Sequence, residues 1–96
     1  SVTLVTGTTA LLHQTCFAVN DGGGTSVMAV GVSGATTIAA SNDFALYFYG
    51  GNYQSGTFSL IVPGLTAGTN TFTLYYLVGG GTSTYLRRYI TVQGVA

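Results

Sequence analysis

The chain has 96 residues, of which 47% are hydrophobic and only 4% are charged. Two Arg and two Asp carry all of its formal charge, so it lacks the cations that nucleic-acid binding or attachment to anionic lipid requires. No apolar run approaches the ~18 residues of a membrane-spanning helix, and we expect neither nucleic acid nor membrane insertion. So few charged residues favour a surface that is largely covered by protein partners. The alternative is that Ser, Thr, Asn and Gln side chains keep the chain soluble.

Alternating apolar and polar residues divide the first half of the chain into short strands, with Gly, Asn and Asp at the turns. These strands are predicted at residues 2–6, 8–20, 25–33, 36–40 and 44–49. In the last of them, Phe44, Leu46 and Phe48 face inward, and Tyr47 and Tyr49 face outward.

The second half begins with a loop at 50–56 and a strand at 57–62, which ends at Pro63 because proline removes a ladder donor. Residues 69–78 and 83–92 then form two long alternating segments. The glycine-rich linker between them can adopt the positive φ angles of a tight reversal, so the two segments are predicted to pair as a hairpin.

Within this predicted hairpin, Phe72 is expected in the core and shares its face with Leu74, Tyr76 and Val78. In the returning strand, Leu86, Ile90 and Val92 share a face with Arg88. The opposite face then carries Tyr85, Arg87 and Tyr89, with Tyr75 on the neighbouring strand.

No stretch shows the 3.6-residue periodicity of a helix. Turn signals recur every 8–12 residues, as in antiparallel sandwiches and jelly rolls. The sequence therefore predicts one all-β domain over residues 1–96, an antiparallel, jelly-roll-like β-sandwich of seven or eight strands.

The chain holds few groups that could carry chemistry. A catalytic triad or a metal site needs clustered His, Cys or carboxylate groups, and here there are one His13, one Cys16, Asp21 and Asp43. The glycine runs precede neither a Lys nor a helix, which argues against a phosphate cradle. We expect no catalytic residues, no metal and no cofactor.

Arg88 is the residue that the alternation places awkwardly. It is predicted to face the interior with Leu86 and Ile90, where a buried guanidinium needs a partner, and Asp43 is the favoured carboxylate. A position at the sheet edge, with the Arg stem covering apolar surface, is the alternative. Arg87 is expected on the tyrosine side, where cation–π contact is favourable.

The tyrosines are the main candidates for an interaction surface, because Tyr combines a large apolar area with a polar tip. Subunit contact, stacking on sugars and ordinary sheet surface are the three interpretations. The candidate contact residues are Tyr47, Tyr49, Tyr53, Tyr75, Tyr85, Arg87 and Tyr89.

The closing third of the chain contains the segment VPGLTAGTNTFTL from Val62 to Leu74, followed by Tyr76, Val78, the glycines and the segment LRRYITV from Leu86 to Val92. It resembles the closing pattern of small β-domains in virion proteins of tailed bacteriophages. Such domains are appended to tail, tail-fibre and head-decoration proteins, and their jelly-roll folds are related in shape to the trimeric C1q and tumour-necrosis-factor modules. Residues 8–11 and 32–37 are similar to the same group.

This resemblance implies a structural virion protein without catalytic residues, decorating the capsid or forming part of a head or tail appendage. Its implied partners are further copies of itself, as a homotrimer, and other virion proteins. A receptor- or glycan-binding module of a tail fibre, using Tyr47, Tyr49 and Tyr53, is the alternative. A bacterial surface immunoglobulin-like spacer is a third interpretation.

Overall fold

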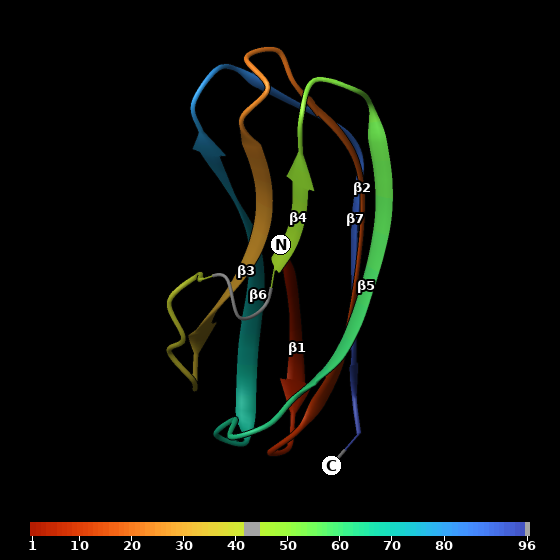
Figure 1. Cartoon of the computed structure of the whole chain (residues 1–96). Coiled ribbons are helices and arrows are strands. Elements are labelled where there is room, and N and C mark those ends of the chain that lie inside the picture. Colours follow the sequence, from red (N-terminus) through yellow and green to blue (C-terminus); the bar gives the residue numbers. More distant parts are fainter. Residues whose placement is uncertain (42–44, 96) are drawn as a thin grey trace.

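Seven β-strands and no helix form in the part of the chain described by the computed structural model, residues 1–41 and 45–95 (Figure 1). The strands are β1 (Val2–Thr6), β2 (Ala10–Asn20), β3 (Thr25–Gly34), β4 (Ala45–Tyr49), β5 (Gln54–Val62), β6 (Gly68–Gly79) and β7 (Ser83–Gly94). The predicted strand at 36–40 is reduced to a single bridge between Ile38 and Val32. The predicted inward position of Phe44 lies outside the described residues.

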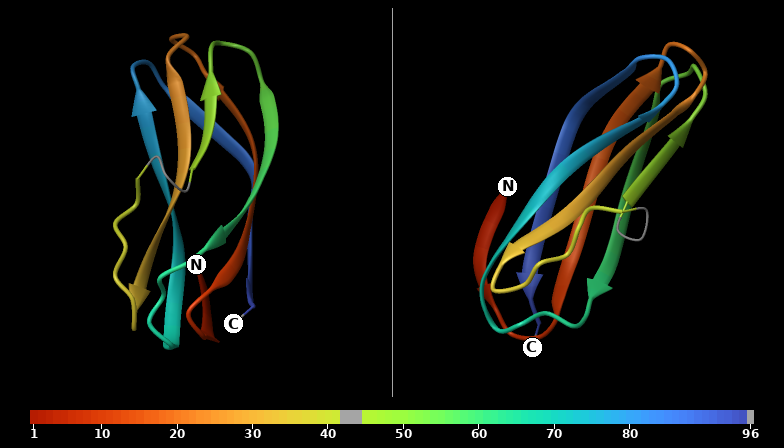
Figure 2. Two further views of the ribbon diagram at one scale, coloured as in Figure 1. Left: turned by 60° about the horizontal axis from the view of Figure 1, so that its bottom comes forward. Right: turned by 90° about the vertical axis from the view of Figure 1, so that its left-hand side faces the viewer.

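The strands form two antiparallel sheets, with the orders β1-β6-β3-β4 and β5-β2-β7. Figure 2 shows the two sheets packed face to face as the layers of a sandwich. Five of the six connections pass from one sheet to the other, as happens in jelly-roll and other Greek-key sandwiches. The prediction of an antiparallel sandwich of seven or eight strands is confirmed.

The predicted hairpin at the end of the chain is wrong. β6 pairs with β1 and β3, whereas β7 pairs with β2 in the opposite sheet. The linking glycines do adopt positive φ angles, 85° at Gly80 and 65° at Gly81. They turn the chain over the end of the sandwich instead of back along the same sheet. Positive φ permits both kinds of reversal, so the glycines did not distinguish them.

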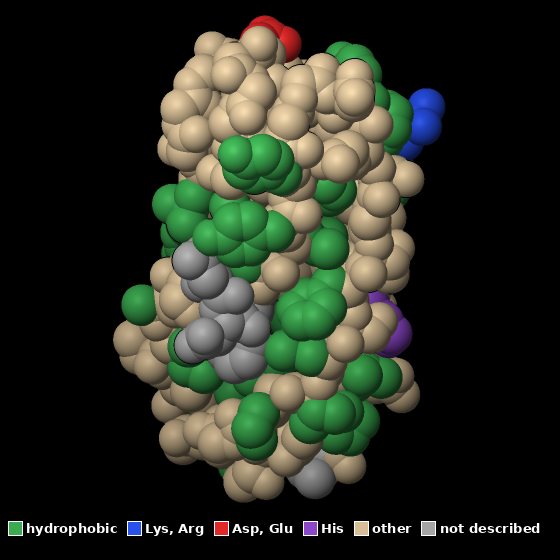
Figure 3. Space-filling view, viewed as in Figure 1, with side chains coloured by type: hydrophobic (Ala, Val, Ile, Leu, Met, Phe, Trp, Pro, Cys, Tyr) green, Lys and Arg blue, Asp and Glu red, His purple; other side chains and the backbone are tan. Residues whose placement is uncertain are grey.

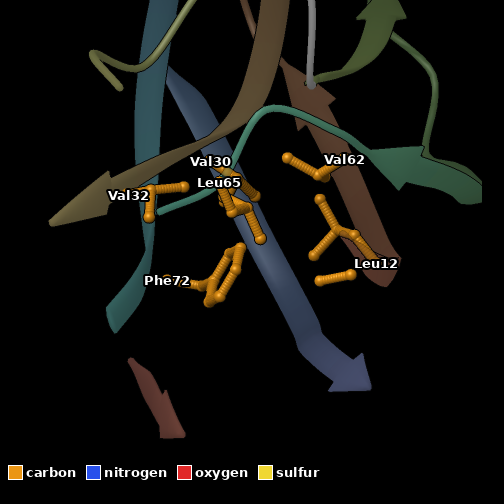
Figure 4. Packing of buried hydrophobic residues seen from close by; sticks show 7 residues of the cluster. Leu12, Val30, Val32, Val62, Leu65 and Phe72 are labelled. Atoms are coloured by element: carbon orange, nitrogen blue, oxygen red, sulfur yellow. The ribbon is translucent and has the colours of Figure 1, made fainter. Parts of the chain in front are cut away.

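The core lies between the sheets and consists of side chains from both. Its larger cluster contains Ala10, Leu12, Val30, Val32, Val62, Leu65 and Phe72, which Figure 4 shows converging between β2 and β3. A second cluster contains Cys16, Ala18, Met28, Leu46 and Phe48. The predicted inward positions of Phe48, Leu46 and Phe72 are therefore correct.

Two buried asparagines close the two ends of the sandwich. The Asn70 side chain accepts a hydrogen bond from the Thr36 amide (2.8 Å) and donates to Thr6 Oγ1 (2.7 Å) and to the Thr66 carbonyl (3.1 Å). At the other end, Asn20 joins the β2–β3 turn to the β6–β7 connection through hydrogen bonds to backbone groups of both. Each asparagine supplies both donors and acceptors to connections whose backbone groups would otherwise lack partners.

The two glycine runs are explained by their contact with each other at the Asn20 end. A Cβ atom on Gly22 would lie 2.8 Å from the Cα atom of Gly81, and one on Gly24 would collide with the Gly79 carbonyl. Glycine is therefore needed for the close approach of two connections, which the Asp21 amide also joins by a hydrogen bond to the Thr82 carbonyl (2.9 Å).

Candidate functional site

A β-bulge in β7 determines where the two arginines point. Thr15 pairs with Tyr89 and Phe17 pairs with Leu86, so β7 contains one residue more than β2 across this interval. Arg87 lies in the bulge with φ of 50°, the left-handed region that non-glycine residues adopt only at a cost in energy. Bulges redirect side chains, and this one reverses the alternation of β7.

The reversal corrects two predicted positions. Tyr85 points into the sandwich, where it packs against the second core cluster, and Leu86 points outward with 43% of its surface exposed. Ile90 and Val92, beyond the bulge, pack against the larger cluster as predicted. Period-2 extrapolation was wrong for Tyr85 and Leu86 because an extra residue shifts the phase of every residue before it.

Arg87 belongs to a cluster on the outer face of the β5-β2-β7 sheet. Its guanidinium carbon lies 5.6 Å from the centroid of the Phe17 ring, within cation–π range. The Phe17 ring stacks on Tyr53 from the β4–β5 connection, with centroids 5.0 Å apart and an interplanar angle of 21°. Leu86 and Tyr89 point outward on β7 beside them. We call this surface the arginine platform: Phe17, Tyr53, Leu86, Arg87 and Tyr89.

Arg88 extends to the opposite side of β7. Its guanidinium carbon lies 5.4 Å from the Tyr76 ring centroid, and Tyr76 in turn contacts Tyr85 with centroids 4.7 Å apart. The predicted buried Arg88 is wrong, because the residue is exposed at the free edge of β7 and an aromatic ring supports its side chain. Its proposed partner Asp43 lies outside the described residues. Charged side chains and a bulge on a long edge strand also discourage pairing with other strands.

The Tyr85 hydroxyl joins the two sheets. It accepts a hydrogen bond from the Val27 amide (3.0 Å) and lies within hydrogen-bond distance of the Val27 and Leu77 carbonyls (3.1 and 2.9 Å). Val27 and Leu77 are paired residues of β3 and β6, so a β7 side chain binds the backbone ladder of the opposite sheet. These hydrogen bonds give Tyr85 a structural role between the two sheets.

Tyr85→Phe is expected to lower the free energy of unfolding by about 1–3 kcal/mol, because the buried Val27 amide loses its hydrogen-bond acceptor. Tyr89→Phe, which removes a hydroxyl from a tyrosine that is 63% exposed, should change it by under ~0.5 kcal/mol. Urea unfolding of both variants provides the comparison. Equal and small losses would show that the Tyr85 hydroxyl adds nothing to stability.

A second exposed surface lies on the outer face of the other sheet. Tyr47 and Leu77 flank Val27 in the register of β4, β3 and β6, with Tyr49 and Tyr75 beside them on the same face. Tyr49 is 73% exposed, and the other three are about half exposed. We call Tyr47, Tyr49, Tyr75 and Leu77 the tyrosine face; none of its side chains is charged.

The structure thus divides the predicted contact residues among three places. Tyr47, Tyr49 and Tyr75 lie together on the tyrosine face, Tyr53, Arg87 and Tyr89 belong to the arginine platform, and Tyr85 is internal. Sequence reasoning missed Phe17, Leu77 and Leu86. Phe17 and Leu77 alternate with inward residues of their strands, so their outward direction was a usable signal. The outward direction of Leu86 depends on the bulge, so no signal in the sequence pointed to it.

Few other polar groups in the described chain could carry chemistry. His13 Nδ1 forms a hydrogen bond of 2.5 Å with Ser59 Oγ on the outer sheet face. Burial raises the pKa of the Cys16 thiol, which keeps it protonated and unreactive. Residues 1–41 and 45–95 contain no pocket and no cluster of three or more His, Cys, Asp or Glu residues that could hold a metal ion. Within the same ranges, no helix long and apolar enough to cross a membrane occurs.

Comparisons with protein-family models, with curated proteins and with solved structures found no significant match to this chain. The resemblance to bacteriophage virion domains therefore stays a prediction from the sequence.

Proposed function

We propose that this domain is a non-enzymatic structural component of a tailed-bacteriophage virion, decorating the capsid or forming part of a head or tail appendage. The resemblance of its closing third supports the virion setting. The observation that carries the proposal is the tyrosine face, an exposed group of aromatic and aliphatic side chains without a charge. Interface cores are depleted of charge and enriched in Tyr, as this face is.

The proposed mechanism is passive assembly. Copies of the domain associate as a homotrimer, and several weak contacts held in one particle provide an avidity that a single small domain lacks. In a cyclic trimer each copy presents two different patches to its neighbours, and the tyrosine face supplies one of them. Figure 3 shows one side of the molecule with hydrophobic groups along its length and charged groups at its rim. A surface so poor in charge offers little electrostatic opposition to self-association.

The tail-fibre alternative, with Tyr47, Tyr49 and Tyr53 as one binding site, has less support. Tyr47 and Tyr49 project from β4 on the outer face of one sheet, whereas Tyr53 stacks on Phe17 over the outer face of the other. The three rings do not form a common surface.

Leu77→Glu is expected to convert the assembly to monomers, because a carboxylate would be desolvated at the centre of an apolar contact. Ala67→Glu adds the same charge in the exposed β5–β6 connection at one end of the sandwich and should leave the assembly intact. Sedimentation velocity at micromolar concentration separates these outcomes. The tyrosine face is not the interface if Leu77→Glu sediments as the wild type does, or if both variants dissociate alike.

A further inference from the structure

The arginine platform holds a cation for which the described chain provides no anion. Arg87 contacts the Phe17 ring, and neither it nor Arg88 forms an ion pair with the described residues. Among the described residues the acidic side chain is that of Asp21, which lies in the turn at the end of the sandwich. A guanidinium binds carboxylates through two parallel N–H groups, so charge complementarity favours a carboxylate-bearing ligand at this position.

The position of Arg87 is fixed before any ligand arrives. The bulge places its backbone in the left-handed region, and the guanidinium lies against the Phe17 ring, which in turn stacks on Tyr53 of the β4–β5 connection. Backbone strain of this kind is concentrated at functional sites. A supported guanidinium loses less conformational freedom on binding, which increases affinity.

The surroundings of Arg87 distinguish between kinds of acidic ligand. Tyr53 and Tyr89 are 56% and 63% exposed, and such ring faces present flat apolar area with a hydroxyl at the tip. Short hydroxyl side chains cover the adjoining outer face of the sheet, including Thr15 and Thr57, whose hydroxyls are 3.3 Å apart. A flat, ring-bearing, hydroxyl-rich surface matches the face and hydroxyl groups of a pyranose better than it matches an acidic peptide.

We propose that the arginine platform binds an acidic saccharide, with the sugar carboxylate on the Arg87 guanidinium and a pyranose ring against Tyr53 or Tyr89. This site is distinct from the tyrosine face and goes beyond the assembly function. It leaves the domain able to attach to an anionic glycan through the arginine platform while the tyrosine face stays available for contact with other copies.

Titration by amide NMR at low salt tests the proposal with defined probes. The acidic probes are tetragalacturonate, a hyaluronate tetrasaccharide and sialyllactose; maltotetraose is the neutral probe and tetraglutamate the acidic peptide. At least one acidic saccharide should bind and shift the amide signals of Tyr53, Arg87 and Tyr89. Binding should weaken as salt is added, since exposed charges are screened.

Arg87→Gln and Arg88→Gln form a matched pair, because both remove one positive charge from adjacent positions. Arg87→Gln should weaken binding about tenfold or more, the effect of losing a charge-assisted pair of hydrogen bonds. Arg88→Gln should change it less than about twofold, since Arg88 lies over Tyr76 on the other side of β7. Tyr53→Ala provides a second test should Arg87→Gln disturb the bulge, and it too should weaken binding.

Four results would overturn the proposal. They are no binding by any acidic saccharide, equal binding of maltotetraose, binding of tetraglutamate in place of the saccharides, and equal losses in the two arginine variants. Leu77→Glu should bind the saccharide as the wild type does, which separates this site from the assembly function.

Discussion

Replacing Phe72 with alanine is expected to lower the free energy of unfolding by about 3–5 kcal/mol, the range for truncating a fully buried aromatic side chain. Phe72 has no exposed surface and packs in the larger cluster among residues of both sheets. Its removal leaves a cavity between sheets whose backbone ladders prevent them from closing over it. Urea unfolding monitored by circular dichroism measures the loss.

Phe48→Ala in the second cluster should show a loss in the same range, since Phe48 is only 7% exposed. Val5→Ala is the matched control because Val5 is 75% exposed on β1, and its effect should stay under ~0.5 kcal/mol. A loss below about 1 kcal/mol for Phe72→Ala would contradict its inward position in β6.

Replacing Asn20 with alanine is expected to lower the free energy of unfolding by about 2–4 kcal/mol, because several buried backbone groups lose their partner together. Its Oδ1 accepts from the Gly22 and Gly24 amides at 2.9 and 3.1 Å. Its Nδ2 donates to the Gly80 carbonyl at 2.7 Å and to Ser83 Oγ at 3.1 Å. The residue is 1% exposed, so water does not replace these bonds without opening the end of the sandwich.

Asn52→Ala is the control for Asn20→Ala, since it removes the same amide from an exposed position in the β4–β5 connection. Hydrogen exchange adds a local measurement. Asn20→Ala should speed exchange at the Asp21 amide, which donates to the Thr82 carbonyl, before the core amides are affected. Comparable stability of the two variants would show that the Asn20 network does not hold this end together.

Local alternation in the sequence was sufficient to predict the strands and much of the core. Phe48, Leu46 and Phe72 lie in segments with strict period-2 patterns. Such a pattern puts every second side chain on one face of the sheet, and the apolar set must be the buried one. β5 ends at Val62, next to Pro63, as the loss of a ladder donor requires.

Pairing between strands could not be predicted in the same way. The glycines between β6 and β7 allow a reversal within one sheet or across two, and the choice depends on what each strand meets elsewhere. β6 has β1 and β3 as neighbours, and β7 has β2. These contacts join residues far apart in the chain, and local pattern carries no information about them.

The candidate surfaces depended on the same missing information. The exposure of Tyr47, Tyr49 and Tyr75 followed from alternation, but their separation from Tyr53 follows from which sheet each strand joins. The bulge at Arg87 could not be predicted from the sequence. A left-handed bulge position usually carries glycine, and here it carries arginine. The bulge reversed the predicted directions of Tyr85 and Leu86. The exposure of Arg88 follows from the place of β7 at the edge of its sheet.

Sedimentation equilibrium of the unmodified chain tests the assembly function most directly. Between about 1 and 100 µM, we expect a species of three times the 9.8-kDa chain mass, with little dependence on salt because the tyrosine face carries no charge. A species of one chain mass across the whole range, with no partner added, would contradict it.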